Sequence, residues 1–282
     1  MCSSDLHYTF YGAPCNLEEL SAMGSAYSGI AIVERAPRSV ASKKHTHKQS
    51  MGLWHCRFGH MSPACIKTMV DKNMVKGIDG YVEWSRGPCN VCASTKLKPA
   101  GRKFIGGLRS TAPLQPIHVD NVEGFTCKSF GNKTGHLFVG DYSRAKFFYP
   151  VKKKSDFLQV LQQLITKLSK ANRTVSSVRI NAIQSDWASE LSAGKTKQWC
   201  DQNGIMLQHS SPGSHKENGI VEKSIDVVKS AARAIMANAG FPAEFWVFAM
   251  LAACHVLMFW PTKITGKTPY ESLFNHTLDV SH

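Results

Sequence analysis

The chain has 282 residues, 43% of them apolar, and its 34 Lys or Arg against 20 Asp or Glu give a formal net charge of +14. An apolar fraction of this size excludes a wholly disordered chain, because it is enough to build a core that offsets the entropy lost on folding. The excess of positive charge makes polyphosphates, and therefore nucleic acids, the favoured class of partner.

Cysteine usage and the N-terminus indicate an intracellular protein, which we expect in the nucleus and cytoplasm. The nine cysteines are odd in number and scattered, as is typical of a reducing compartment without structural disulfides. The N-terminus lacks the basic stretch followed by an apolar one that marks a secretory signal. The longest apolar run, residues 245–260, is shorter than the roughly 20 residues that cross a bilayer, so we predict a buried helix and no membrane partner.

Changes in composition divide the chain into predicted parts. The first part is rich in Ser, Ala and Gly, and the third is a basic stretch. The others carry the apolar periodicity of folded segments. In order, the parts are a loosely ordered lead-in (1–50), a small helical domain (51–98), a basic linker (99–113), an α/β core (114–240) and a helical C-terminal extension of the core (241–282).

The helical domain and the linker have the clearest local signals before the core. Ser62 is a predicted N-cap, Pro63 fits the first helical position and Gly77 fits the C-terminal cap, so a helix is predicted between them. No acidic residue occurs between Glu83 and Asp120, whereas basic residues and glycines accumulate there. This pattern is typical of a basic connection between two folded units.

The core alternates between strands and helices. The order β-β-β-α-β-α-β-α predicts a mixed sheet with helices packed on it. The expected strands are residues 117–119, 136–140, 145–151, 178–183 and 205–208, and the expected helices are residues 155–170, a helix that ends at 203–204, and residues 218–239.

Four residues have the spacing of a metal site: His55-x4-His60, then 28 residues, then Cys89-x2-Cys92. Two imidazoles and two thiolates complete a tetrahedral Zn²⁺ shell. Five residues apart on one helix the two histidines would point about 140° apart, so the helix must break between them, and Gly59 can supply the break. The alternative is four unrelated residues in a chain with 12 His and nine Cys. Neighbouring residues that spacing favours less as ligands are His45, His47, Cys56 and Cys65.

Three acidic residues could form a second site. Asp120 lies on the first core strand, Asp186 just past the fourth, and Glu222 in the first turns of the long helix. If the fourth strand lies beside the first, these carboxylates meet at one edge, where they would repel one another without cations between them. Oxygen ligands suit two Mg²⁺ or Mn²⁺ ions, which can activate a hydroxyl and stabilise the leaving oxygen of a phosphodiester. Taken singly, each acid is better explained as a solvated surface residue, and only the three together indicate a site.

Two cations follow Glu222 along its helix. Lys229 and Arg233 lie seven and eleven positions beyond it, within about 20° of its direction on an ideal helix. They could lay a phosphate backbone across the metal site, or they could solvate the outer face of an amphipathic helix. Together with basic residues around the linker, they make up the predicted nucleic-acid-binding set: Lys96, Lys98, Arg102, Lys103, Lys229 and Arg233.

From residue 24 to 275 the chain resembles the integrase of copia-type LTR retrotransposons, part of the retroviral integrase superfamily. Several independent motifs occur in the order of that family. They are residues 53–60 (LWHCRFGH) with 89–92 (CNVC), similar to the pre-integrase HHCC zinc region; 141–144 (DYSR), similar to the second-strand signature; 185–186 and 211–223, similar to the second and third catalytic segments; and 245–246, 261 and 266–270, similar to the helix and loop after the core.

The resemblance implies an RNase H-like core in which Asp120, Asp186 and Glu222 hold two Mg²⁺ or Mn²⁺ ions. In such enzymes water first trims the end of the element's DNA, and the exposed 3′-hydroxyl then attacks a phosphodiester of the target. The implied partners are DNA, both element ends and target, and further copies of the chain. By the same mapping Asp141 has a structural role.

Two turns depart from the family pattern. Where the family usually has Asp-x-x-Gly-Pro, residues 120–125 read DNVEGF, and where it favours Asn-Gly-Gly-Glu after the second acid, residues 187–190 read WASE. Ala and Ser in place of glycines, and an indole in place of a small amide, alter the surroundings of the site.

Three functions therefore stay open at this point. The first is a strand transferase, including a truncated or decayed copy of one, since the chain stops at His282 without the reverse transcriptase and RNase H of the polyprotein. The second is a non-catalytic zinc-containing nucleic-acid-binding protein co-opted from a retrotransposon. The third is a nuclease of the same fold that only hydrolyses.

Overall fold

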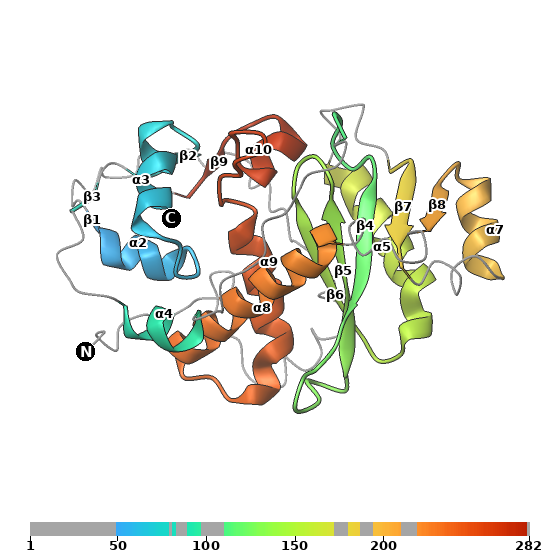
Figure 1. Ribbon diagram of the computed structural model, residues 1–282, viewed down its shortest axis with the longest axis horizontal. Coiled ribbons are helices and arrows are strands. Elements are labelled where there is room, and N and C mark those ends of the chain that lie inside the picture. Colours follow the sequence, from blue (N-terminus) through green and yellow to red (C-terminus); the bar gives the residue numbers. More distant parts are fainter. Residues whose placement is uncertain are drawn as a thin grey trace.

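The computed structural model describes residues 49–78, 81–82, 89–96, 110–171, 180–186, 194–209 and 219–280. A mixed sheet of five strands lies among helices (Figure 1). Three consecutive strands form an antiparallel meander. A fourth strand pairs in parallel with the first of these three, and a fifth pairs in parallel with the fourth. In spatial order the strands are β6 (Lys146–Val151), β5 (Thr134–Gly140), β4 (Ile117–Val122), β7 (Ala182–Ser185) and β8 (Met206–His209).

The helices and the short strands complete the described part of the chain. The helices are α2 (Met51–Arg57), α3 (Pro63–Asp71), α4 (Asn90–Thr95), α5 (Phe157–Ala171), α7 (Lys195–Gln202), α8 (Gly219–Ala239), α9 (Trp246–Leu257) and α10 (Pro269–Phe274), with 3-10 turns η2 (Lys154–Asp156) and η3 (Ala243–Phe245). The short strands pair in parallel as β1 (Gln49–Ser50) with β3 (Tyr81–Val82) and β2 (Val75–Lys76) with β9 (Leu278–Asp279).

This architecture confirms the predicted fold class, an RNase H-like mixed sheet flanked by helices and preceded by a small helical region. The order of the core elements along the chain is also the predicted one. The fourth core strand, β7, lies beside the first, β4, with Ile117 paired to Ile183 and His118 to Gln184. The predicted approach of Asp120 to Asp186 depends on this pairing of β4 with β7.

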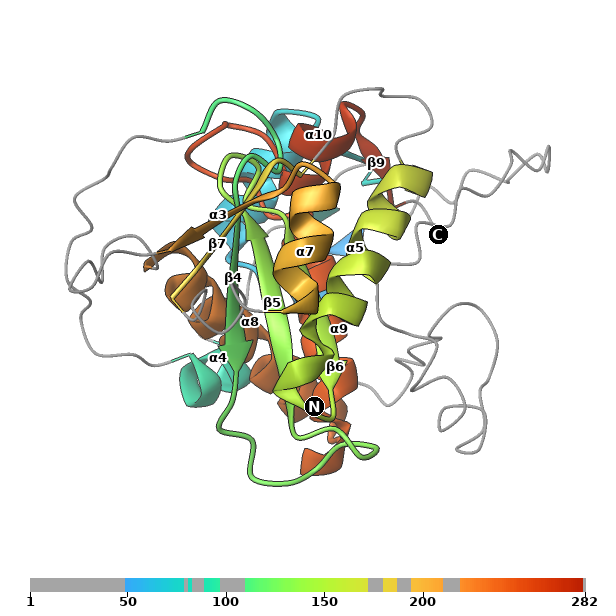
Figure 2. The same cartoon turned by 90° about the vertical axis from the view of Figure 1, so that its right-hand side faces the viewer.

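The two faces of the sheet serve different hydrophobic cores. Ile117 and Val119 of β4 pack in one cluster with α5, whereas Val122 of β4 and Leu137 of β5 pack in another with α8 and α9. Figure 2 shows α5 in front of the strands and α8 behind them. Because successive side chains of a strand point to opposite faces, Asp120 shares the face of Val122. The sheet therefore presents Asp120 on the side covered by the helix that carries Glu222.

Some predicted boundaries were wrong, and for helix α3 the reason is a distant segment. Helix α3 begins after its N-cap Ser62 as predicted, but it ends at Asp71 and not at Gly77. Asn73 turns the chain with a φ of 50°, and the residues after it form β2, which pairs with β9 near the C-terminus. Strand β7 starts at Ala182, later than predicted, so that Asp186 follows its last residue directly.

The C-terminal segment packs on the small helical region as well as on the core. Trp54 and Phe58 of the helical region share a buried cluster with Met258 and Phe259. The indole Nε1 of Trp260 donates a hydrogen bond of 3.0 Å to the backbone oxygen of Phe58. Residues after α9 therefore hold the first folded segment against the rest of the molecule (Figure 1).

Within the ranges that the structure describes, no helix is both long enough and apolar enough to cross a membrane.

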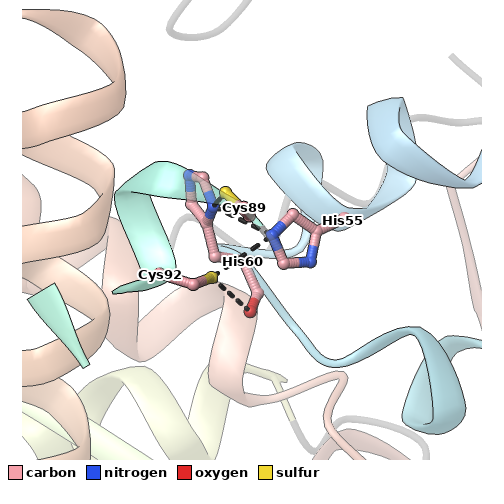
Figure 3. A group of neighbouring side chains, drawn as sticks. All are labelled: His55, His60, Cys89 and Cys92. Carbon is pink, nitrogen blue, oxygen red and sulfur yellow. Dashed lines mark hydrogen bonds between the residues drawn. The ribbon is translucent and has the colours of Figure 1, made fainter. Parts of the chain in front are cut away.

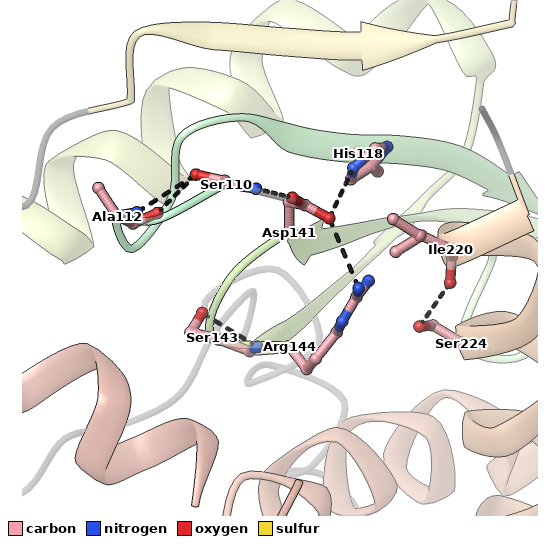
Figure 4. A network of polar contacts seen from close by, with 9 residues as sticks. Ser110, Ala112, His118, Asp141, Ser143, Arg144, Ile220 and Ser224 are labelled. Atoms are coloured by element: carbon pink, nitrogen blue, oxygen red, sulfur yellow. Dashed lines mark hydrogen bonds and ion pairs between the residues drawn. The ribbon is translucent and has the colours of Figure 1, made fainter. Parts of the chain in front are cut away.

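Asp141 ties the end of the linker to the core (Figure 4). Its buried carboxylate accepts a hydrogen bond of 2.7 Å from the Ser110 backbone and lies 3.6 Å from His118 Nε2 and 3.5 Å from Arg144 Nη2. Burial acts to raise the pKa of Asp141, but the bonds from His118 and Ser110 and the charge of Arg144 outweigh it, so the pKa is lowered. The carboxylate thus stays ionised as a structural anchor, the role that the resemblance implied.

We expect Asp141→Ala to lower the free energy of unfolding by about 3 kcal/mol, because it leaves Arg144 and the Ser110 N–H without their buried partner. Urea denaturation at neutral pH measures the loss. The matched control is Asp201→Ala on the exposed face of α7, which should change stability by less than about 0.5 kcal/mol. Equal small effects of both substitutions would contradict the anchoring role.

Candidate functional site

A sharp reversal after α2 brings the two histidines of the helical region together. The hydroxyl of Ser50 caps the helix by accepting from Leu53 N at 3.2 Å, and the helix ends at Arg57. Gly59 and His60 then take left-handed φ angles of 59° and 62°. The chain turns back so that His60 N donates to the backbone oxygen of His55 at 2.7 Å. The predicted break between the histidines is therefore present, at Gly59 and His60 themselves.

The four predicted metal-ligating residues converge on one point (Figure 3). One ligand atom from each of His55, His60, Cys89 and Cys92 lies within 4.8 Å of the other three. His55 Nε2 is 3.1 Å from His60 Nδ1 and 3.3 Å from Cys92 Sγ, and Cys89 Sγ is 3.5 Å from His60 Nδ1. We call these residues the HHCC group.

The donor chemistry of the HHCC group suits Zn²⁺. His55 Nδ1 lies 2.6 Å from the backbone oxygen of Met61, which can only accept, so Nδ1 donates and the lone pair of Nε2 points into the group. The pKa of His60 is lowered to about 4, mainly by burial and then by the neighbouring His55 and Lys96. Burial also lowers the pKa of His55. Both imidazoles are therefore neutral at physiological pH, the state in which histidine binds metals.

Several side chains around the HHCC group had no signal in the local sequence. Lys96 Nζ donates to the backbone oxygens of His60 at 2.7 Å and Gly59 at 3.3 Å and lies 5.4 Å from the ring centroid of Trp260. Asn238 of α8 lies near the His60 side chain and acts to raise its pKa, against the larger effect of burial. Asn238 is far from His60 in the sequence, so only the folding of the chain brings the two residues together.

The nucleic-acid-binding set is only partly described. Three of its members lie outside the described residues: Lys98, Arg102 and Lys103. Lys96 lies beside the HHCC group, where its ammonium group already donates to backbone oxygens. Contact between Lys96 and a DNA phosphate stays a prediction. Lys229 Nζ donates to the backbone oxygen of Glu123 at 2.5 Å and lies 5.5 Å from the Phe125 ring centroid, whereas Arg233 is exposed.

The three acidic residues come from three elements: the inner strand β4, the end of the neighbouring strand β7, and the start of α8. The parallel register of β4 and β7, continued by two residues beyond His118 and Gln184, brings Asp120 level with Asp186. Glu222 lies in the first turn of α8, which packs on the face of the sheet that carries Asp120. Asp186 and Glu222 are exposed, and Asp120 is half-buried.

Asp120 is electrostatically coupled to the other two acids. Its pKa is raised to about 6, first by burial, and further by the negative charges of Asp186, Glu222 and Glu123. A hydrogen bond of 2.6 Å from the backbone N–H of Asn121 to Asp120 Oδ1 opposes that rise. A carboxyl group whose pKa is raised by neighbouring negative charges shows the electrostatic pattern of a site that receives cations.

The acids do not close into a common ligand shell. Among the described residues, the HHCC group alone has three or more His, Cys, Asp or Glu side chains whose ligand atoms approach within 4.8 Å. The altered residues 187–190 after Asp186 lie outside the described residues.

We expect Asp120→Asn to stabilise the metal-free protein at neutral pH. Because the pKa of Asp120 is raised on folding, the folded protein binds the proton more tightly, so ionised Asp120 lowers stability as pH rises through about 6. In EDTA, urea unfolding should show a gain of about 1 kcal/mol near pH 7.5, after allowance for solvent screening, that vanishes near pH 4. The exposed control Asp226→Asn should show no such pH-dependent gain, and a loss of stability in Asp120→Asn would refute the raised pKa.

Sequence comparisons relate the chain to mobile elements. Residues 31–97 match the GAG-pre-integrase domain family, a range that includes the whole HHCC group and begins within the predicted lead-in. The chain is 24% identical over 235 residues to the retrovirus-related Pol polyprotein from transposon TNT 1-94 of Nicotiana tabacum, and 26% identical over 236 residues to that from transposon RE1 of Arabidopsis thaliana. Each match covers 83% of this chain but only 17% and 15% of the relatives, so the chain spans about a sixth of their length.

Solved integrase structures are similar at 16% sequence identity. The catalytic core domain of HTLV-2 integrase in complex with magnesium, in a trimeric form, aligns with 58% of this chain and 98% of its own at a TM-score of 0.45. A simian T-cell lymphotropic virus intasome in complex with PP2A regulatory subunit B56 gamma aligns with 79% of this chain and 74% of its own at a TM-score of 0.49.

Proposed function

We propose that this chain, which corresponds to the integrase region of a copia-type retrotransposon Pol polyprotein, is a metal-dependent DNA strand transferase. The observation that carries the proposal is the electrostatic coupling of Asp120 to Asp186 and Glu222, three carboxylates from three separate elements at one edge of an RNase H-like sheet. This concentration of negative charge occurs in a chain with a net charge of +14.

In this proposal Asp120, Asp186 and Glu222 hold Mg²⁺ or Mn²⁺. Such cations act as Lewis acids that help a hydroxyl attack a phosphodiester and stabilise the oxygen that leaves. The chain itself keeps Asp120 partly out of water and orients its Oδ1 through the Asn121 N–H. Partial burial strengthens the attraction of the carboxylate for a cation, because solvent screens it less.

The HHCC group is proposed to hold one structural Zn²⁺. All four positions are filled by protein side chains, as in structural zinc sites, with no ligand position left for a substrate. The group lies between the helical region and α8, where it can fix the two parts of the chain to each other. Its role is therefore to shape the protein and not to react.

The proposed partners are the ends of the element's DNA, the target DNA and further copies of the chain. The net charge supports attraction to phosphate, and Arg233 continues the helix face of Glu222 toward solvent. A strand transferase of this kind would act where its target DNA is, so we propose a nuclear site of action after synthesis in the cytoplasm.

The second candidate is a non-catalytic zinc-containing nucleic-acid-binding protein. One observation favours it: the three acids lie too far apart to share ligands as the HHCC group does. Residues 187–190 (WASE), which replace glycines beside the second acid, point the same way. The two candidates share the fold and the zinc group, and they differ only in whether cations can draw the acids together.

One experiment separates the candidates. The full chain is incubated with a labelled DNA end and a supercoiled plasmid in Mg²⁺ or Mn²⁺, and the products are separated on a gel. Label joined to plasmid supports strand transfer, whereas nicked plasmid without joined label supports a nuclease that only hydrolyses. DNA binding without either product would overturn the enzymatic proposal in favour of the non-catalytic one.

A further inference from the structure

A cluster of four phenylalanines lies outside both candidate metal sites, where the β4–β5 hairpin meets the start of α9. Phe130 stands at the tip of the hairpin, with its ring centroid 5.7 Å from that of Phe245 and 5.1 Å from that of Phe248. Phe241 stacks on Phe245 at 5.2 Å. Figures 1 and 2 both show the hairpin beside the start of α9 at the lower end of the molecule. We call these four residues the aromatic platform.

The platform concentrates the exposed apolar surface of the described residues. Four large apolar side chains are exposed in that part of the chain, and two of them, Phe130 at 37% and Phe241 at 44%, belong to the platform. The other two, Met206 and Ile264, lie on separate elements. Single exposed apolar residues are ordinary, but rings gathered in one contiguous patch indicate a surface that binds something.

The backbone of Phe130 gives a second, independent indication. The hairpin turn is closed by hydrogen bonds between Ser129 and Asn132, and its two central residues, Phe130 and Gly131, have φ angles of 48° and 83°. This left-handed geometry favours Gly, Asn or Asp at both central positions and is unfavourable for a bulky side chain. Phe130 therefore has an unfavourable backbone conformation and is partly exposed; strain of this kind is typical of functional positions.

The rim of the platform is basic. Four exposed lysines lie on the segments that carry or flank the hairpin: Lys128, Lys133, Lys152 and Lys153. The register that pairs Thr134 with Val151 brings Lys133 opposite Lys152 at the next step, and Lys152 also approaches Gly131 in the turn. Of the nearby acids, Glu123 is paired with Lys154 at 2.6 Å, which leaves Glu244 of η3 as the exposed acid on the platform's own segments.

We propose that the aromatic platform binds an unpaired DNA strand, with bases stacked on Phe130 and Phe241 and phosphates on the lysine rim. Aromatic faces among cations are the general means of binding single strands without reading their sequence, whereas a duplex keeps its bases stacked inside. A second copy of the chain fits less well, because four lysines would face a partner of the same positive net charge.

The loop that carries Phe130 is also the continuation of the strand that carries Asp120. The hairpin loop begins directly after β4, three residues beyond Asp120, and Lys229 of α8 bonds to Glu123 within it. The proposal rests on the proposed function only in taking DNA as the ligand.

The test measures binding of a short labelled oligothymidine to the full chain by fluorescence anisotropy, in an Asp120→Asn background that prevents cleavage. Phe130→Gly removes the ring and suits the left-handed φ, so its urea midpoint should be equal or higher while single-strand affinity falls about tenfold. Phe241→Ala should lower affinity similarly, and Phe130→Tyr, which keeps the ring, should retain it. The matched control is Ile264→Ala, an equally exposed residue, which should bind as the parent does.

Unchanged single-strand affinity in Phe130→Gly would overturn the proposal, as would an equal loss of affinity for duplex DNA. Binding of an acidic, aromatic-containing peptide that depends on Phe130, without single-strand binding, would identify a protein partner and overturn it as well. If the parent joins DNA but Phe130→Gly binds single strands as the parent does, only the platform proposal is refuted. Ring-dependent single-strand binding in a parent that joins no DNA refutes only the strand-transfer proposal.

Discussion

Cys89→Ser is expected to remove zinc from the protein and to unfold the helical region. The purified parent should contain about one zinc per chain, and the variant close to none, because Ser is a poor ligand and three ligands leave the tetrahedral shell open. Structural zinc contributes roughly 10 kcal/mol in isolated zinc-finger peptides, so a loss of several kcal/mol in the free energy of unfolding is expected here. Metal analysis and urea denaturation with and without EDTA measure the two effects.

The matched control is Cys65→Ser. Cys65 lies on α3 in the same helical region, partly buried, but it is not a member of the HHCC group. It should keep its zinc and lose less than about 1.5 kcal/mol of stability. A parent protein that contains no zinc and whose unfolding does not respond to EDTA would refute the zinc proposal.

The effect of zinc loss should extend beyond the helical region. Cys56 contacts Asn238 of α8, and Phe58 accepts the hydrogen bond of Trp260, so the region packs on the helix that carries Glu222 and on the segment after α9. If zinc is lost and the helical region unfolds, these contacts are lost as well. We expect hydrogen exchange of the last turns of α8 to accelerate in Cys89→Ser, and exchange of β5 at the centre of the sheet to change least.

Asp186→Asn and Glu222→Gln are each expected to lower the rate of DNA joining by roughly 10³-fold, which corresponds to ~4 kcal/mol of transition-state stabilisation. Each substitution replaces a charged oxygen ligand by a neutral amide, which weakens the attraction of the site for Mg²⁺ or Mn²⁺. The overall fold should not change, because both side chains are exposed. Joining of labelled DNA ends to plasmid measures the rate, and anisotropy on duplex DNA checks that binding is retained.

The control for this prediction lies on the same helix. Asp226 is exposed on α8 one turn beyond Glu222, and Asp226→Asn removes the same charge at a position that does not raise the pKa of Asp120. It should join DNA at a rate close to that of the parent. If Asp226→Asn is as impaired as Glu222→Gln, the activity depends on the charge of the helix and not on a site built from three acids.

Local chemistry explains why much of the helical region could be predicted. Ser62 and Pro63 start α3 because a hydroxyl cap and a fixed φ act within one turn. The His-x4-His spacing required a break, and Gly59 with His60 makes it. The end of α3 was not predictable in the same way, because β2 forms only by pairing with β9 at the other end of the chain.

The acidic site also has features that the sequence predicted and features that depend on the tertiary structure. Alternating strands and helices were sufficient to predict the sheet, and β7 beside β4 brings Asp120 level with Asp186. The burial of each carboxylate depends on which elements pack around it, and no local pattern in the sequence records that packing. Asp120 alone is partly buried and has its pKa raised to about 6, because it lies under α8 within the sheet.

The sequence by itself determined the order of the elements, the fold class and the identity of the zinc-ligating candidates, because caps, turns, strand alternation and ligand spacing act over a few neighbouring residues. Only the tertiary structure decided what holds these parts together: the bond between Trp260 and Phe58, 202 residues apart, the place of Lys96 beside the HHCC group, and the gathering of Phe130 and Phe241 on one basic surface. Contacts of that kind depend on packing between distant segments, and their energies appear only once the whole chain has folded.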